Sequence, residues 1–316
     1  MKISIITVCF NARDKIENTI KSVICQDYKD VEYVIVDGAS TDGTCDIIRK
    51  YMQLCDTQAV ANVSIKFVSE KDRGLYDAMN KGIRLSKGDY IEFLNAGDEL
   101  FDAGVLSRVA EKTEQRSDKK GRDFIHTPQK GCIFYGNIIY KNPDGTEDVR
   151  IYGKSCKRPI YFATGDCVNH QAIFAPKEAF CGGYSKKNSK KNCEKSSEKN
   201  CDKNDAPLLK TENIKKSTGV PFRDEIYKIC ADRDWMMRVT RAGFKWEALN
   251  DTVVKYDLAA DSVSVRDKQR LRKEERRCLK ENFPLMLPIY DAFTFCRNNV
   301  VLSKLLHRIY EILYIK

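Results

Sequence analysis

The chain has 316 residues, of which 42% are hydrophobic and 32% are charged. This composition is typical of a globular protein and excludes an intrinsically disordered one. A chain of this length can bury one large α/β domain, alone or with a smaller appendage. No segment reaches the roughly 20 consecutive apolar residues that a membrane-spanning helix needs, and the apolar N-terminal stretch ends at Asn11, too early for a signal peptide. We therefore expect a cytoplasmic protein.

The 13 cysteines are an odd number and include no CxxC pair, so neither a disulfide scaffold nor a zinc ribbon is indicated. Cys9, Cys132 and Cys230 lie among apolar residues, where a free thiol behaves as a small hydrophobic group. We interpret the cysteines as reduced.

The net charge of +10 is concentrated in residues 185–217 and 266–280. Basic surfaces of this kind attract anionic lipid headgroups or nucleic acid, but a solvated loop and a solvated helix face have the same composition. Both interpretations of the basic segments remain open, and we expect no nucleic-acid partner.

Short apolar strands alternate with helical patterns over the first hundred residues. The predicted elements, in chain order, are a strand at 3–8, a helix at 13–25, a strand at 32–37, a helix through 47–52, a strand at 64–68, a helix at 75–85 and a strand at 90–94. Buried strands that alternate with helices form parallel sheets with right-handed crossovers. The sequence therefore predicts an α/β fold with a mainly parallel central sheet.

The pattern is weaker beyond residue 100. Residues 133–140 are typical of a strand that enters a hairpin turn at 142–145. Residues 185–218 are rich in Lys, Asn, Ser and Glu, which cannot offset the entropy of ordering, so we predict a mobile insertion there. A helix is predicted at 227–242, and residues 283–316 mix apolar and basic side chains.

Ligands of open α/β sheets bind beyond the carboxyl ends of the strands. Three segments meet this condition here, at residues 7–11, 37–42 and 95–98, and each carries polar or acidic side chains directly after an apolar strand. These segments are the candidate ligand site.

Asp98 follows an apolar strand and the flexible Gly97. Mg²⁺ and Mn²⁺ prefer oxygen ligands, and such an ion can neutralise the charge that grows on a departing diphosphate. Asp98 is therefore the candidate metal ligand, with a helix-capping role as the alternative.

Other acidic residues also have two interpretations. Asp37 and Asp72 could contact a nucleoside, or each could stabilise a turn through its own side chain. Asp232 and Asp234 open a predicted helix, where one of them could be a general base or both could interact with the helix dipole.

Several enzyme classes lose support from missing motifs. The three histidines, His126, His170 and His307, fit no metal-binding spacing. No HExxH, GxSxG, P-loop or GxGxxG motif is present, which disfavours zinc proteases, serine hydrolases, nucleotide hydrolysis and dinucleotide chemistry.

Ordered motifs in the N-terminal hundred residues resemble those of family 2 glycosyltransferases. The segments ITVCFN, SVICQDY and VDGASTDGT, at 6–11, 22–28 and 36–44, look like the opening of that family. Residues 69–82 and 88–98 resemble a bacterial branch that builds surface polysaccharides, colanic-acid-type enzymes among them. Weaker matches continue at 169–174, 229–238 and 256–264, so that the resemblance covers roughly residues 2–265 apart from the Lys-rich stretch.

The resemblance implies a GT-A (Rossmann-like) fold and an inverting transfer of sugar from a UDP-sugar or similar donor to a saccharide or lipid-linked saccharide. It also implies roles for individual residues. These are Asp232 as the catalytic base, Asp98 as the ligand of a divalent metal (Mn²⁺ or Mg²⁺), Thr7, Asn11, Asp37, Asp72 and Asn95 at the donor nucleotide, and His170, Gln171, Asp234 and Arg238 on the acceptor side.

The chain departs from the family pattern in two places. Asn95, Ala96 and Gly97 stand before Asp98 where many relatives have an acid-rich triplet, and Ala231 replaces the first acid of the pair that contains the base. Asp98 as the sole protein carboxylate implies weak metal binding that the donor phosphates complete.

We assign residues 1–265 to the GT-A domain and residues 266–316 to a basic, amphipathic helical extension. This extension could contact the inner face of the plasma membrane, or its helices could pack over the catalytic domain. The alternative function is a noncatalytic saccharide- or partner-binding protein on the same fold. A nucleotidyltransferase would need a Gly-rich basic loop after the first strand, which residues 11–13 do not form.

Overall fold

The structure is a computed structural model of the whole chain, and it describes residues 1–57, 63–120, 131–142, 144–152, 159–164, 167–181, 221–258 and 267–297. The Lys-rich stretch at 185–218, for which a mobile insertion is predicted, lies outside these ranges.

The N-terminal half is a parallel sheet with the strand order β3-β2-β1-β4. Its strands are β1 (Ile3–Cys9), β2 (Val31–Asp37), β3 (Val63–Ser69) and β4 (Tyr90–Phe93). Every residue of β1, β2 and β4 is buried, as in a sheet whose two faces are both covered. The predicted α/β fold with a parallel core is confirmed.

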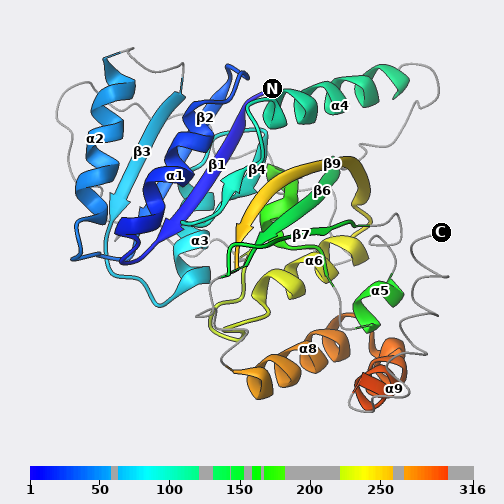
Figure 1. Cartoon of the computed structure of the whole chain (residues 1–316). Coiled ribbons are helices and arrows are strands. Elements are labelled where there is room, and N and C mark those ends of the chain that lie inside the picture. The colour runs from blue at the N-terminus through cyan, green and yellow to red at the C-terminus, as the bar shows by residue number, and fades with distance from the viewer. Residues whose placement is uncertain are drawn as a thin grey trace, which may run out of the picture.

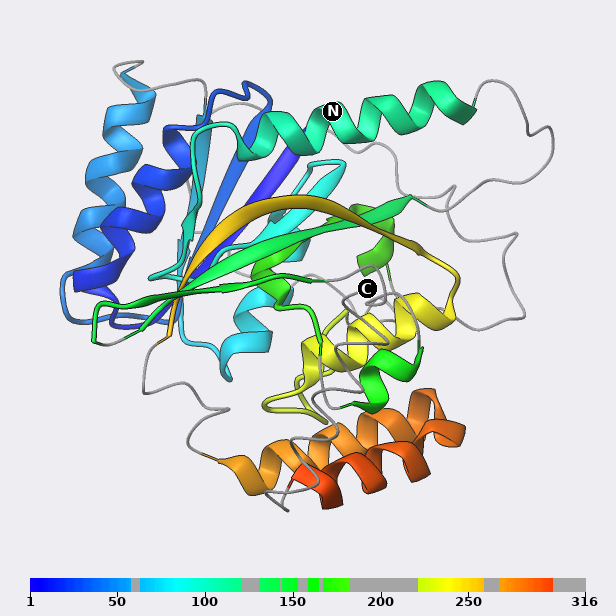
Figure 2. The same ribbon diagram turned by 45° about the vertical axis from the view of Figure 1, so that its right-hand side comes forward.

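Helices cover both faces of this half. Helices α1 (Arg13–Ile24) and α2 (Thr44–Asp56) pack together on one face, as Figure 2 shows, and the right-handed crossover to β4 brings α3 (Leu75–Leu85) to the other. Helix α3 approaches β1 closely at Gly82, where an added Cβ atom would lie 2.4 Å from Cγ2 of Ile6. Each of these helices was predicted.

The C-terminal half extends the same sheet with mixed strand directions. Strand β8 (Ile173–Pro176) runs antiparallel to β4, and β6 (Cys132–Lys141), β9 (Lys245–Asp257) and β5 (Glu99–Leu100) follow it in that order. Strand β7 (Glu147–Arg150) pairs with β6 to form the predicted hairpin. Helix α4 (Val105–Lys120) and the long strand β9 were not predicted.

Several helices lie below the mixed half in the orientation of Figure 1, namely α5 (Pro159–Ala163), α6 (Ala231–Arg241), α8 (Lys268–Asn282) and α9 (Leu287–Arg297). The structure also has the 3-10 turns η2 (His170–Ala172), η3 (Lys177–Phe180) and η5 (Pro284–Met286). Helix α8 packs against α6, and α9 packs against α8 and α5.

Helix α6 begins at Ala231, four residues later than the pattern predicted. The backbone N–H groups of Lys228, Ile229 and Cys230 donate to the side chain of Glu274 on α8, and these residues precede the helix. A contact with a distant helix, which local periodicity does not reveal, thus sets the start of α6.

In the described ranges, no helix combines the length and the apolar character that crossing a bilayer requires. The cysteines that the structure describes are free thiols.

Candidate active site

Asp37 ends β2 at the edge where the parallel strands terminate. Its carboxylate is buried and accepts hydrogen bonds from the Ser69 hydroxyl (2.7 Å), from the backbone N–H of Ser40 (2.9 Å) and from the Cys45 thiol (3.3 Å). Burial raises the pKa of Asp37, but the bonds from Ser40 and Ser69 outweigh burial and hold that pKa below its usual value. Asp37 is therefore an oriented, ionised carboxylate.

Asp72 and Phe10 meet over Gly38, directly after Asp37. A Cβ atom on Gly38 would lie 2.8 Å from Oδ2 of Asp72 and 3.3 Å from the Phe10 ring, so a side chain at this position would require the Asp72 carboxylate to shift. The Phe10 side chain is 64% exposed. Sequence reasoning missed Phe10 as a site residue, although an aromatic side chain directly after a buried strand is a signal for stacking against a ligand ring.

Asn11 shapes the same edge, whereas Thr7 lies deeper. Asn11 has a positive φ of 47°, donates its backbone N–H to Ser40 Oγ (2.7 Å) and accepts the N–H of Thr41 at its side-chain oxygen (3.0 Å). Thr7 is fully buried, and its hydroxyl donates to the carbonyl of Leu94 (2.7 Å). Asn11 thus holds the loop that follows β2, and Thr7 joins β1 to the end of β4.

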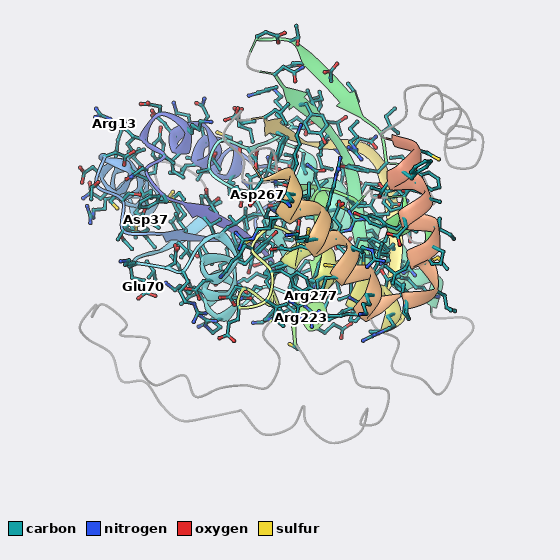
Figure 3. The ribbon with its side chains drawn as sticks, turned by 90° about the horizontal axis from the view of Figure 1, so that it is seen from below. Arg13, Asp37, Glu70, Arg223, Asp267 and Arg277 are labelled. Carbon is teal, nitrogen blue, oxygen red and sulfur yellow. The ribbon has the colours of Figure 1, made fainter. Side chains whose placement is uncertain are left out.

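Figure 3 shows Arg13 and Glu70 on the same flank of the molecule as Asp37. The backbone N–H of Arg13 donates to Asp42 (3.0 Å), and the backbone N–H of Glu70 donates to the carbonyl oxygen of Asp37 (3.0 Å). The ends of β1, β2 and β3 therefore form one continuous edge.

Asp98 lies past the end of β4 and is only 4% exposed. One carboxyl oxygen accepts a hydrogen bond from the side-chain amide of Gln171 (3.2 Å), and the other accepts a hydrogen bond from the backbone N–H of Asp257 (3.0 Å). Burial raises the pKa of Asp98 to about 7, since these hydrogen bonds and the nearby His170 offset only part of the desolvation. Among the described residues, two neutral donors therefore compensate only partly for the burial of this carboxyl.

A hydrogen-bonded chain joins the end of β4 to the start of α6. Asn95 Nδ2 lies 3.1 Å from Nε2 of His170, and Nδ1 of the same imidazole lies 3.1 Å from Oδ2 of Asp232. The other oxygen of Asp232 lies 2.8 Å from the hydroxyl of Tyr76 on α3. Neutral His170 satisfies this network when it donates from Nδ1 to Asp232 and accepts from Asn95 at Nε2.

The carboxyl group of Asp232 differs from that of Asp98. Burial raises the pKa of Asp232, but the hydrogen bonds from His170 and from the Tyr76 hydroxyl outweigh burial and lower that pKa below its usual value. Asp232 is therefore a carboxylate that is ionised at neutral pH. Its side chain keeps 16% of its surface exposed.

The structure does not bring Asp234 and Arg238 to this network. Asp234 is fully buried and pairs with Arg223 and Arg238, and it accepts the side-chain amide of Asn282 (3.0 Å). In Figure 3 Arg223 lies beside Arg277, and both guanidinium groups stand over the Tyr227 ring at 5.2 and 5.6 Å. These contacts join α6 and the segment before it to α8, and none of them involves Asp232.

The sequence resemblance implies a divalent cation. The residues around Asp98 fit a cation that the phosphates of a bound donor would coordinate together with few protein groups. Within the described ranges, no cluster of three or more His, Cys, Asp or Glu side chains is arranged to hold a metal. Oδ1 of Asn95, however, is buried and accepts no hydrogen bond from the described residues. A single buried carboxylate and an amide oxygen without a partner are hard donors that suit Mg²⁺ or Mn²⁺ when phosphates and water complete the coordination.

Comparison with known proteins agrees with this geometry. The crystal structure of Staphylococcus aureus TarS residues 1–349 superposes with a TM-score of 0.56 at 15% identity, covering 95% of this chain and 74% of that one. A crystal structure of the same TarS segment with UDP-GlcNAc also gives a TM-score of 0.56, at 13% identity over 93% of this chain and 72% of that one. The fold is therefore that of the GT-A-like proteins, as the resemblance implied.

The sequence model of the family described as "Glycosyl transferase family 2" matches residues 4–174, which are more than half of the chain. The chain belongs to glycosyl transferase family 2.

Curated relatives match part of the chain. A Mycobacterium bovis PGL/p-HBAD biosynthesis glycosyltransferase is 30% identical over 177 residues, which are 56% of this chain and 60% of the relative. The Bacillus subtilis putative teichuronic acid biosynthesis glycosyltransferase TuaG is 37% identical over 115 residues, 36% of this chain and 43% of the relative. The matched stretches thus span less than two thirds of either relative's length.

Proposed function

We propose that this protein is an inverting glycosyltransferase that moves a sugar from a nucleotide-sugar donor to a saccharide or lipid-linked saccharide acceptor in surface polysaccharide biosynthesis. The observation that carries the proposal is the link through His170. It joins Asn95 at the end of β4 to Asp232 at the start of α6, so the edge suited to a nucleotide and the candidate base belong to one site.

The donor nucleotide would bind along the ends of β1 and β2. The exposed Phe10 ring offers a stacking surface for a nucleobase, and Asp72 and the ordered Asp37 lie beside it. TarS, whose fold this chain shares, binds UDP-GlcNAc. A UDP-sugar is therefore the first donor to test.

Asp98 and the Asn95 side-chain oxygen would hold a divalent cation at the donor diphosphate, where the cation would neutralise the growing negative charge. The protein would contribute the carboxyl group of Asp98, which the fold shields from solvent. Gln171 and the backbone of Asp257 fix its two oxygens.

Asp232 would accept the proton of the acceptor hydroxyl as the hydroxyl oxygen bonds to the anomeric carbon. The bond between that carbon and the diphosphate breaks at the same time, and the diphosphate leaves with the electron pair. One base suffices for this direct displacement, and no covalent intermediate is required. His170 and Tyr76 orient the carboxylate for this step.

Two further assignments belong to the proposal. His170 and Gln171 would lie on the acceptor side of the site. Peripheral contact with an anionic membrane surface would involve the C-terminal helices, where Leu285 and Phe295 are 85% and 70% exposed.

The first experiment measures thermal stability with UDP, GDP, dTDP and CDP, each with and without Mn²⁺, for wild type, Asp98→Ala and Phe10→Ala. We expect one nucleotide to raise the melting temperature in a metal-dependent manner that Asp98→Ala abolishes. Because base–aromatic stacking contributes about 1–3 kcal/mol, Phe10→Ala should weaken nucleotide binding roughly 5- to 100-fold.

Phe295→Ala removes an equally isolated exposed ring far from the edge and is the matched control. Stabilisation by a nucleotide that neither the metal nor Asp98→Ala changes would contradict the metal assignment. No response to any nucleotide would favour the noncatalytic binding protein.

A further inference from the structure

Glu274 lies on α8, in the C-terminal extension, and its carboxylate faces the start of α6. It accepts three consecutive backbone N–H groups, those of Lys228 (3.1 Å), Ile229 (2.8 Å) and Cys230 (3.0 Å). Its side chain is nearly buried, with 11% exposed. Successive N–H groups that converge on one anion form a concave binding site for that anion, here filled by a side chain of the same protein.

The segment that Glu274 holds leads directly into the candidate base. Helix α6 starts at Ala231, and Asp232 is its second residue. Cys230 is the N-cap residue of α6, and its side chain makes no capping hydrogen bond. The start of α6 therefore lacks the N-cap bond that commonly stabilises the first turn of a helix.

Helix α3 makes a second contact with the same segment. The hydroxyl of Tyr76 on α3 contacts the carbonyl oxygen of Ile229 as well as the carboxylate of Asp232. The backbone before the base is thus bound by α8 through its N–H groups and by α3 through its carbonyl.

Other bonds between α8 and α6 lie further along the helix. Glu275 pairs with the buried Arg233 at 3.0 Å, and Asn282 donates to Asp234 at 3.0 Å. These two bonds secure the body of α6, whereas the bond of Glu274 reaches the residues before Asp232.

We propose that Glu274 is a positioning residue for the transfer reaction, and that α8 is part of the active-site structure. Glu274 fixes residues 228–230 so that the carboxylate of Asp232 meets His170 in the orientation needed for proton acceptance. This inference rests on the proposed role of Asp232 as the base.

The test uses the full chain and a signal that needs no substrate. The chain has three histidines, so imidazole NMR signals of histidine-labelled protein are few, and a His170→Gln variant assigns those of His170. We expect Glu274→Ala to move the His170 signals in the same direction as Asp232→Asn. Glu274→Gln, which keeps one acceptor oxygen, should give a smaller change.

Leu279→Ala is the matched control, since Leu279 is fully buried on α8 and its substitution loosens the packing without removing the carboxylate. If Leu279→Ala lowers the melting temperature as much as Glu274→Ala does, the His170 signals should still be unchanged in Leu279→Ala. Unchanged His170 signals in folded Glu274→Ala would overturn the inference, and if that variant does not fold, Glu274→Gln is judged by the same signals.

A kinetic arm separates this inference from the proposed function. With UDP-GlcNAc as donor and water as acceptor, release of UDP should show a kcat about 10- to 100-fold lower in Glu274→Ala, with the donor KM nearly unchanged, because a base displaced by about 1 Å loses that much rate. Full activity of Asp232→Asn would refute the proposed base. An inactive Asp232→Asn beside a fully active Glu274→Ala would refute only the positioning role.

Discussion

Asp98 and Asp232 are two carboxyl groups near His170 whose pKa values their surroundings shift in opposite directions. Asp98 has two neutral donors, Gln171 and a backbone N–H, and its pKa is raised to about 7. Asp232 has His170 and Tyr76 as partners, and its pKa is lowered. Asp232 is therefore held as an ionised carboxylate, whereas Asp98 keeps a proton to a higher pH than an ordinary aspartate does.

Glu92, on β4, is another buried carboxyl, and the proposed reaction does not use it. It is fully buried, and neither carboxyl oxygen has a hydrogen-bond partner in the described part of the chain. Burial, and after it the negative charge of Asp98, raises the pKa of Glu92 well above its usual range. The folded protein thus binds this proton more tightly than the unfolded chain does.

We expect Glu92→Leu to stabilise the protein by up to about 3 kcal/mol at pH 8, because the substitution removes an unpaired buried polar group. The gain should shrink at pH 5. With a raised folded-state pKa, wild type loses stability as the pH rises above the unfolded value of about 4.3. Chemical denaturation at both pH values measures the effect.

Glu147→Leu, at an exposed position on β7, serves as the control and should show no such pH dependence. A Glu92→Leu variant that is less stable than wild type at pH 8 would mean that the carboxyl is stabilised in the native state.

The placement of Asp37 and Asp98 was predictable because Asp37 ends one short, mostly apolar strand and Asp98 lies beyond the end of another. The role of Tyr76 was not, since its partner Asp232 lies 156 residues further along the chain. Helical spacing assigns Tyr76 to a helix but gives no information about the other element that its hydroxyl meets.

At the scale of elements, the contact between α3 and β1 depends on the absence of one side chain. We expect Gly82→Ala to destabilise the protein by roughly 1–3 kcal/mol, because its Cβ atom would lie 2.4 Å from the fully buried Ile6. Urea denaturation of Gly82→Ala, Ile6→Ala and the double variant measures the coupling.

The two substitutions should cost less together than the sum of their separate effects, since Ile6→Ala removes the atom that clashes. Additive losses, or a Gly82→Ala variant that gains stability from its better helix propensity, would show that α3 does not approach β1 this closely.

The elements that the sequence did not predict have weak local patterns. Strand β9, which was missed, mixes buried and exposed positions without regular alternation. Strands β5 and β8 have two and four residues, too few to show a period. Strands β1, β2 and β4 were predictable because burial on both faces favours runs of mostly apolar residues.

At the scale of the molecule, the basic charge of α8 is partly neutralised within the fold. Arg276 pairs with Asp291, and Arg277 pairs with Glu281. We nevertheless expect the full chain to sediment with anionic vesicles, because the exposed Leu285 and Phe295 add apolar contact to the remaining positive charge.

Binding should fall steeply between about 0.05 and 0.5 M salt, as electrostatic attraction to lipid does. A Leu285→Ser, Phe295→Ser variant should bind more weakly than wild type, and neutral vesicles provide the comparison. Equal recovery with neutral and anionic vesicles, or no binding at all by the full chain, would remove the membrane proposal.

The order in which the ribosome makes the chain has a consequence for the contact between Asp98 and Asp257. These two residues are separated by 159 positions. At translation rates of about 5–20 residues per second, Asp98 therefore waits roughly 8 to 30 seconds for its partner. The ribosome makes β1 and β2 long before it makes α6 and the helix α8 that packs against α6. A nascent chain therefore contains the residues proposed to bind the nucleotide before it contains the candidate base. A ribosome that stalls in between would leave a product that has the donor edge without the group proposed to perform the transfer.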